Sequence, residues 1–180
     1  GNLCAGTIDS WLIYKLTGNH FTDPSNASRT MLYNINKHGW DQQLLEIFHI
    51  PLSILPEVKA SNANFGHINP AIIGSPIPVL AVLGDQQASL YGQLCFKSGS
   101  VKNTYGTGCF MLMNTGTSRI NSVSGLISTI AWQLEGEQAV YALEGSVFIA
   151  GAAIQWLRDG LKLIDDSPDS EFYAMKVEES

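Results

Sequence analysis

The chain has 180 residues, of which 10 are Lys or Arg and 16 are Asp or Glu, so its formal net charge is −6. This acidic balance excludes a general nucleic-acid-binding protein, which carries an excess of basic residues that neutralise phosphates. Apolar residues make up 45% of the sequence, which excludes wholesale disorder, and charged residues only 14%, against about 25% in typical soluble proteins.

The cysteines and the apolar runs predict a cytoplasmic protein. Cys4, Cys95 and Cys109 lie far apart and form no C-x-x-C pair, so they indicate neither a disulfide framework nor a zinc site. No apolar run reaches the roughly 18 residues that a membrane-spanning helix needs, so we expect no membrane insertion. The chain starts at Gly1 without a signal sequence, and we expect it to be an internal part of a longer polypeptide.

The first half of the chain predicts helices, a short strand and one buried strand. Residues 8–16 carry apolar side chains at helical spacing, and Gly18 follows as a stop signal. Residues 31–35 alternate weakly and predict a short strand, and Asp41 is typical of the N-cap of a second helix. The continuous apolar run at residues 78–83 predicts a strand that is buried on both faces, with a helix directly after it.

The second half is rich in predicted β-structure. A polar stretch at residues 94–100 suggests a domain boundary, so we expect one domain over residues 1–93 and another over residues 94–180. Strands are predicted at residues 101–105, 109–114, 126–132 and 138–143, and the last two are expected to form a hairpin. Residues 145–163 predict a helix that begins with small side chains.

A carboxylate follows the predicted buried strand. In α/β proteins, ligands bind outside the carboxyl ends of strands, and the Gly84-Asp85-Gln86-Gln87 segment stands at such an end. Asp85 could act there as a general base on a hydroxyl group, with the amide of Gln86 holding that hydroxyl. The alternative is that Asp85 caps the following helix, since Asp is a favoured N-cap residue. Position alone leaves both roles open.

Two further features have both a binding and a structural interpretation. Thr107 lies in a glycine turn between two predicted strands, where a hydroxyl and turn amides can bind phosphate, or where the glycines simply supply positive φ angles to a hairpin. The turn matches neither the dinucleotide fingerprint nor the P-loop. Gly151 and Gln155 share a helical face, which could admit a ligand or could pack closely on a sheet.

Several segments together resemble the glycerol kinases, a group within the FGGY family of carbohydrate kinases. The resemblance runs through residues 6–13, 22–32, 84–88, 102–110 and 155–159, in this order. It implies an α/β fold of the actin-like ATPase type, with two ribonuclease H-like domains that close on a cleft. Residues 1–93 would then be the end of the glycerol-binding domain, and residues 94–180 the start of the ATP-binding domain.

The same resemblance implies a reaction and a set of site residues. The reaction is transfer of the ATP γ-phosphoryl group to glycerol, giving sn-glycerol 3-phosphate, with Mg²⁺ as the cofactor. Asp85 would be the catalytic base and contact glycerol together with Gln86, whereas Thr107, Gly151 and Gln155 would bind ATP. No residue is expected to bind the metal directly. The family's amino-terminal phosphate loop and its later adenosine motif are absent from the 180 residues, so we expect this chain alone to be inactive.

Two other functions stay open from the sequence. One is an FGGY kinase that acts on a pentulose or on gluconate, although the amide directly after Asp85 favours glycerol. The other is a non-catalytic actin-like module that binds a nucleotide without turning it over. The expected partners are glycerol and ATP, and a homo-oligomer is one of the open forms of assembly.

Overall fold

A computed structural model describes residues 3–178 of the chain. Contacts divide these residues into two compact units. The larger unit comprises residues 3–102 and 112–144, and the smaller unit comprises residues 103–111 and 145–178. No helix of the described residues is long and apolar enough to cross a membrane.

Helices of the larger unit begin and end at the local signals that the sequence predicts. The prediction for the first helix is confirmed, because the helix ends at Gly18, whose φ of 78° is left-handed and whose amide donates to the Tyr14 carbonyl. The Asp41 N-cap is also confirmed, since its carboxylate accepts from the amides of Gln43 and Leu44. The helices are α1 (Ile8–Thr17), α2 (Pro24–Ala27), α3 (Gln42–Ile47), α4 (Pro70–Ile73) and α5 (Asp85–Gly92), and a 3-10 turn spans Leu52–Ile54.

Short strand pairs connect these helices. Strand β1 (Phe21–Thr22) pairs in parallel with β4 (Glu57–Val58), and β2 (Tyr33–Asn34) pairs antiparallel with β3 (Gly39–Trp40). The strand predicted at residues 31–35 is therefore present but limited to Tyr33–Asn34.

The buried strand predicted at residues 78–83 is wrong. The segment is extended, yet it forms only an isolated bridge between His67 and Pro78, and Leu80 is 56% exposed. Its backbone bonds in the described residues go to residues 61–68, for example between Val79 and Gly66. A strand that is buried on both faces needs neighbouring strands on both edges and covering layers above and below, and only one edge is paired here.

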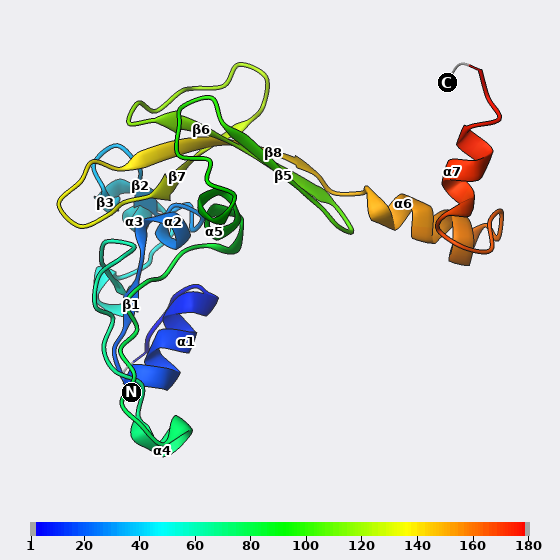
Figure 1. The fold of residues 1–180 in the computed structure, drawn as a ribbon. Helices are drawn as coiled ribbons and strands as arrows, with labels where there is room; N and C mark the ends of the chain where they lie inside the picture. Colours follow the sequence, from blue (N-terminus) through cyan, green and yellow to red (C-terminus); the bar gives the residue numbers. More distant parts are fainter. Residues whose placement is uncertain (1–2, 179–180) are drawn as a thin grey trace. The chain divides into compact units, whose positions relative to one another are not determined.

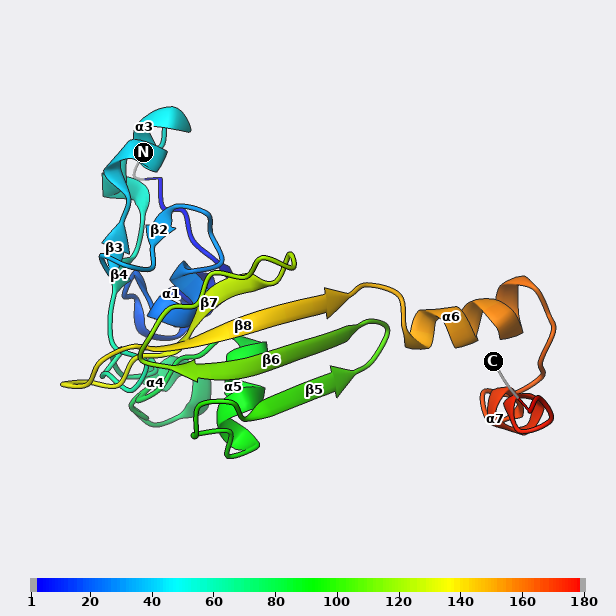
Figure 2. The same ribbon diagram turned by 90° about the horizontal axis from the view of Figure 1, so that it is seen from above.

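A four-stranded sheet forms the second part of the fold, with strand order β5-β6-β8-β7 (Figures 1 and 2). The predicted hairpin is confirmed, because β7 and β8 pair antiparallel with Ile130 opposite Tyr141. The bounds are β5 (Val101–Tyr105), β6 (Cys109–Gly116), β7 (Ile127–Trp132) and β8 (Val140–Val147).

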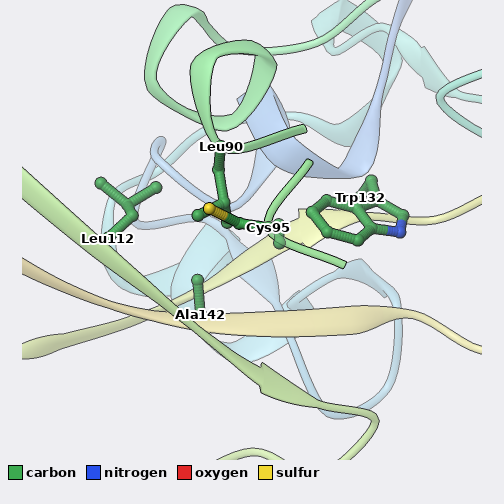
Figure 3. Close-up of a cluster of buried hydrophobic side chains, with 6 residues drawn as sticks. Leu90, Cys95, Leu112, Trp132 and Ala142 are labelled. Carbon is green, nitrogen blue, oxygen red and sulfur yellow. The ribbon is translucent and has the colours of Figure 1, made fainter. Parts of the chain in front are cut away.

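Helix α5 joins this sheet through the core of the larger unit. Leu90 of α5 is fully buried and packs with Leu112 of β6 and Trp132 of β7 (Figure 3). Cys95 and Ala142, labelled in the same view, belong to the cluster together with Ala131. Because α5 begins at Asp85, this packing fixes the position of the helix whose first residue is the candidate base.

The smaller unit contains the β5–β6 turn and the carboxyl-terminal helices. Helix α6 (Gly151–Gln155) continues into a π-helical turn (Trp156–Gly160), and α7 (Asp169–Ala174) follows. The helix predicted from residue 145 is therefore wrong at its start, since β8 runs to Val147. Pairing with the sheet prevails over the small-residue pattern there, and the β-branched and aromatic side chains that follow disfavour a helix.

Candidate functional site

Asp85 is the first residue of α5 and is exposed to solvent. Gly84 is the N-cap and offers no side chain, so Asp85 does not occupy the capping position that the alternative interpretation requires. The Asp85 Oδ1 atom accepts from the Gln86 backbone amide at 2.8 Å, and Oδ2 accepts from Gln86 Nε2 at 3.3 Å. A carboxylate at a helix N-terminus is also stabilised by the helix dipole. The side chain is thus oriented by Gln86 and remains accessible.

A buried polar network lies beneath the Gly84 turn. Asp23 is fully buried, and its Oδ1 accepts from the Ser25 hydroxyl and from the Asn26 side chain, both at 2.8 Å. Its Oδ2 accepts from the Ser61 hydroxyl at 2.8 Å. The Ser25 Oγ in turn accepts from the Gly84 amide at 2.8 Å. This network connects the segment at residues 22–32 to the residue directly before Asp85.

Burial has the largest effect on the pKa of Asp23. Loss of solvation raises the pKa of this carboxyl above its ordinary value, and hydrogen bonds from Asn26, Ser61 and Ser25 oppose the shift without cancelling it. Buried carboxylates with several donors keep a fixed geometry because every lost donor leaves a charge unsatisfied. Asp23 therefore holds the Ser25 hydroxyl, and through it the Gly84 turn, in a fixed position.

A second group of charges adjoins Gln86. Lys102 on β5 is only 5% exposed, and its ammonium donates a hydrogen bond to Gln86 Oε1. Burial lowers the pKa of Lys102, whereas the negative charges of Asp85 and Glu144 raise it. Glu144 is buried as well and forms an ion pair of 2.9 Å with Arg29.

Sequence reasoning assigned no role to these charged and polar side chains. Lys102, Asp23 and Ser25 lie in segments that carry the family resemblance, but nothing in their local pattern indicates burial. The same holds for Glu144, which lies outside those segments, and its ion-pair partner Arg29 is exposed. On β5 the pattern is even misleading, since Val101 is 47% exposed while its charged neighbour is buried. Several of their partners lie far away in the sequence, such as Ser61 for Asp23, Gly84 for Ser25 and Arg29 for Glu144, so only the fold reveals these contacts.

The smaller unit brings together the other three predicted site residues. Thr107, Gly151 and Gln155 line one hollow of about 400 Å³, together with Gly106, Ile154, Ser167 and Ser170. Hydroxyl and amide groups provide the polar part of its wall, and Ile154 provides an apolar part. Among residues 3–178, no basic side chain lines it, so an anionic ligand there would need backbone amides or a cation to balance its charge.

Close backbone contact holds this hollow together. The amide of Gly151 donates to the Gly106 carbonyl at 3.0 Å, and the amides of Ala150 and Ala152 donate to the Thr107 carbonyl at 2.8 and 3.1 Å. A Cβ atom on Gly151 would lie 2.6 Å from the Gly106 oxygen, so this position requires glycine. The packing interpretation of Gly151 is therefore correct in part, although the surface it packs on is the turn rather than the face of a sheet.

Two family models match the chain in succession. The amino-terminal domain of the FGGY family of carbohydrate kinases matches residues 3–92, and the carboxyl-terminal domain of the same family matches residues 101–178.

Proteins similar to this chain include glycerol kinases of several organisms. The chain is 59% identical to the glycerol kinase of Mycoplasmoides gallisepticum over 97% of its own length, and 57% identical to glycerol kinase 2 of Clostridium tetani over all of it. These matches cover 35% and 37% of the two relatives, so the chain spans about a third of their length.

Solved structures agree in fold. Glycerol kinase of Plasmodium falciparum, solved with ADP, superposes with a TM-score of 0.88 at 42% identity and covers 96% of this chain and 35% of its own. Xylulose kinase of Lactobacillus acidophilus superposes with a TM-score of 0.81 at 22% identity over 94% of this chain and 35% of its own, which is a likeness of fold alone. The predicted α/β, actin-like ATPase class is therefore confirmed.

Proposed function

Because the chain belongs to the FGGY family of carbohydrate kinases, we propose that the protein of which it forms part transfers the γ-phosphoryl group of ATP to glycerol, giving sn-glycerol 3-phosphate. The observation that supports this choice is the identity of 54–59% to glycerol kinases across nearly the whole chain. Since the chain spans about a third of those relatives, the activity is assigned to the full-length protein and not to residues 1–180.

Asp85 is the general base in this proposal. A glycerol hydroxyl oxygen attacks the γ-phosphorus, the bond from that phosphorus to the β–γ bridging oxygen breaks, and ADP leaves with the bond's electron pair. The hydroxyl proton passes to the Asp85 carboxylate, which is exposed and held by Gln86. The Gln86 amide binds a glycerol hydroxyl and keeps it in line for attack. Most of the rate enhancement in such a transfer comes from positioning and charge stabilisation.

Thr107, Gly151 and Gln155 form the nucleotide side of the proposed site. The hollow they line has hydroxyl and amide groups in its wall, and the β5–β6 turn can approach α6 this closely only because residue 151 has no side chain. Mg²⁺ would supply the positive charge that the wall lacks. Among residues 3–178, no three His, Cys, Asp or Glu side chains form a group that could hold a metal ion. We propose no direct Mg²⁺ ligand in this chain, since Mg²⁺ in kinase sites is held largely through substrate phosphates and water.

We further propose that residues 1–93 belong to the glycerol-binding domain and residues 94–180 to the ATP-binding domain. The separate matches of the two family models support this division. The compact units divide the chain elsewhere, because α5 packs against β7 and draws part of the sheet into the larger unit. The scattered cysteines support a cytoplasmic protein, and homo-oligomerisation remains a proposal that gel filtration of the full-length protein can test.

The experiment that tests the function is a substrate panel on the full-length protein. With ATP and Mg²⁺ present, we expect phosphorylation of glycerol at a far higher kcat/KM than that of xylulose, another pentulose or gluconate. Preference for one of the sugars would overturn the choice of glycerol. Nucleotide binding with no turnover of any of these acceptors would instead indicate a non-catalytic module.

A further inference from the structure

Lys102 is a buried cation next to the candidate base. Its side chain is 5% exposed although it carries an ammonium group, and burial of a charged group is costly unless hydrogen bonds or opposite charges compensate it. The Lys102 ammonium donates a hydrogen bond to Oε1 of Gln86, the residue directly after Asp85. Gln86 lies 16 positions before Lys102 in the chain. Both residues belong to the larger unit, so this contact lies within one compact body.

The chemistry of the two side chains decides which end of the Gln86 amide faces Lys102. A lysine ammonium has three donors and no acceptor, so only the amide oxygen can bond to it. With Oε1 taken by Lys102, Nε2 points to the Asp85 carboxylate, which it reaches at 3.3 Å. A reversed amide would set Nε2 against the ammonium and Oε1 against the carboxylate, and both contacts would then be repulsive.

We propose that Lys102 is a positioning residue that fixes the Gln86 amide, so that Gln86 donates both to Asp85 and to the glycerol hydroxyl. This inference rests on the proposed function for its kinetic consequences but not for its structural ones. Nε2 carries two hydrogens, and Asp85 takes one of them. The second is directed to a hydroxyl oxygen of the acceptor. Gln86 thereby presents a donor, never an acceptor, to the substrate.

The surrounding charges keep Lys102 suited to this role. Glu144 is buried within the same unit, and its negative charge favours the protonated ammonium against the effect of burial. Glu144 also forms an ion pair of 2.9 Å with Arg29. Arg29 thus helps to hold the Glu144 side chain in place, and the negative charge of Glu144 favours the protonated form of Lys102.

The kinetic test is a double-mutant cycle in the full-length protein. We expect Lys102→Met to lower kcat/KM for glycerol by about tenfold to a hundredfold and to leave the KM for ATP unchanged, since hydrogen bonds to charged groups are among the stronger ones. In a Gln86→Ala background the same substitution should have almost no further effect. Lys102→Arg should recover most of the loss. The matched control is Lys97→Met, which removes an exposed lysine and should change neither parameter.

Several outcomes would overturn the proposal. Additive effects of Lys102→Met and Gln86→Ala would show that Lys102 does not act through Gln86. Equal losses of kcat/KM in Lys102→Arg and Lys102→Met would show that a cationic donor at position 102 is not what matters. If Lys102→Met fails to fold, Gln86→Glu is measured instead. Lys102 then holds one oxygen of the new carboxylate, and the other faces Asp85, so the acid limb of the pH profile of kcat/KM for glycerol should move to higher pH. An unmoved acid limb would contradict the proposed geometry.

A spectroscopic measurement separates this proposal from the proposed function. In the ¹⁵N-labelled full-length protein, the side-chain amide resonance of Gln86 is assigned by its loss in Gln86→Ala. We expect this resonance to shift in Lys102→Met and to keep its position in Lys97→Met. Failure of the wild-type protein to phosphorylate glycerol would refute the proposed function alone. An unshifted Gln86 resonance in Lys102→Met would refute the role of Lys102, whatever the substrate.

Discussion

The hydroxyl oxygen of Ser25 accepts a hydrogen bond of 2.8 Å from the backbone amide of Gly84, although the two residues lie 59 positions apart. The same hydroxyl donates to the buried Asp23 carboxylate at 2.8 Å. Since Gly84 is the N-cap of α5 and Asp85 is its first residue, a fixed carboxylate in the core sets the backbone position of the candidate base through a single hydroxyl. Positioning of this kind matters because phosphoryl transfer depends on alignment.

Ser25→Ala should therefore impair catalysis while the protein stays folded. The change leaves the Gly84 amide without its acceptor and removes one donor from Asp23, a loss of about 1–3 kcal/mol of stability. In the full-length protein we expect kcat for glycerol phosphorylation to fall about tenfold, because the turn before Asp85 loosens. Steady-state kinetics with a parallel thermal melt would measure both effects. Ser53→Ala, at an exposed position, is the control, and equal kcat values for the two variants would contradict the role of Ser25.

Asp23 should make the free energy of unfolding depend on pH in the acid range, with a sign opposite to that of a carboxyl group whose native pKa is lowered. Burial raises its native pKa above the ordinary 3.8, so the native state holds this proton more tightly than the unfolded state. The contribution of Asp23 to the free energy of unfolding is therefore largest below pH 3.8, falls as the pH rises through the native pKa, and is constant above it. Urea titrations at a series of pH values should show this fall in the wild type minus Asp23→Asn difference.

Asp41 offers the matched comparison for Asp23. Hydrogen bonds from the Asn34 side chain and the Leu44 amide lower its native pKa, so its contribution is present above the ordinary pKa and is lost as the pH falls. The wild type minus Asp41→Asn difference should thus rise with pH, opposite in direction to that of Asp23. The same slope for both variants would show that burial does not control the protonation of Asp23.

Local signals predicted much of this fold, and long-range contacts account for what the sequence missed. The ends of α1 and α3 follow from Gly18 and Asp41, because a left-handed C-cap and a side-chain N-cap act within a few residues. The apolar run at residues 78–83 carries no information about its neighbours, so its predicted burial as a strand is wrong. The helix predicted from residue 145 begins only at Gly151, since sheet pairing extends β8 to Val147.

In the candidate site as well, local spacing predicted one part, and long-range contacts determine the other. Gly151 and Gln155 are one helical turn apart, and the structure places them in one hollow with Thr107, as their proposed common ligand requires. The surroundings of Asp85 could not be predicted, because they depend on the contact of Gln86 with Lys102 and of Gly84 with Ser25. Charged residues in apolar strands are indistinguishable by sequence from solvent-facing ones until the layers that cover them are known.

Asp85→Asn tests the proposed base directly. Asparagine keeps the shape of the side chain and an oxygen that can accept from the Gln86 amide, but it cannot take up the hydroxyl proton. In the full-length protein we expect kcat to fall by about 10²–10⁴-fold with glycerol and ATP binding retained, as measured by calorimetry. Asp159→Asn is the control, because Asp159 is exposed and pairs only with its neighbour Arg158 among the contacts described. Wild-type turnover in Asp85→Asn would remove Asp85 from the mechanism.

Gly151→Ala should separate nucleotide binding from catalysis. The added Cβ would lie 2.6 Å from the Gly106 carbonyl oxygen, and since both atoms belong to the backbone, the turn and α6 must move apart. Alanine is the better helix former by about 1 kcal/mol, so a loss of function would not reflect a weakened helix. We expect the KM for ATP to rise at least about tenfold, because a shift of about 1 Å in a positioned site has large effects, while the KM for glycerol stays close to that of the wild type. Gly39→Ala is the matched control, as its Cβ meets no atom within 4 Å. An unchanged KM for ATP in Gly151→Ala would mean that the hollow between the β5–β6 turn and α6 does not bind the nucleotide.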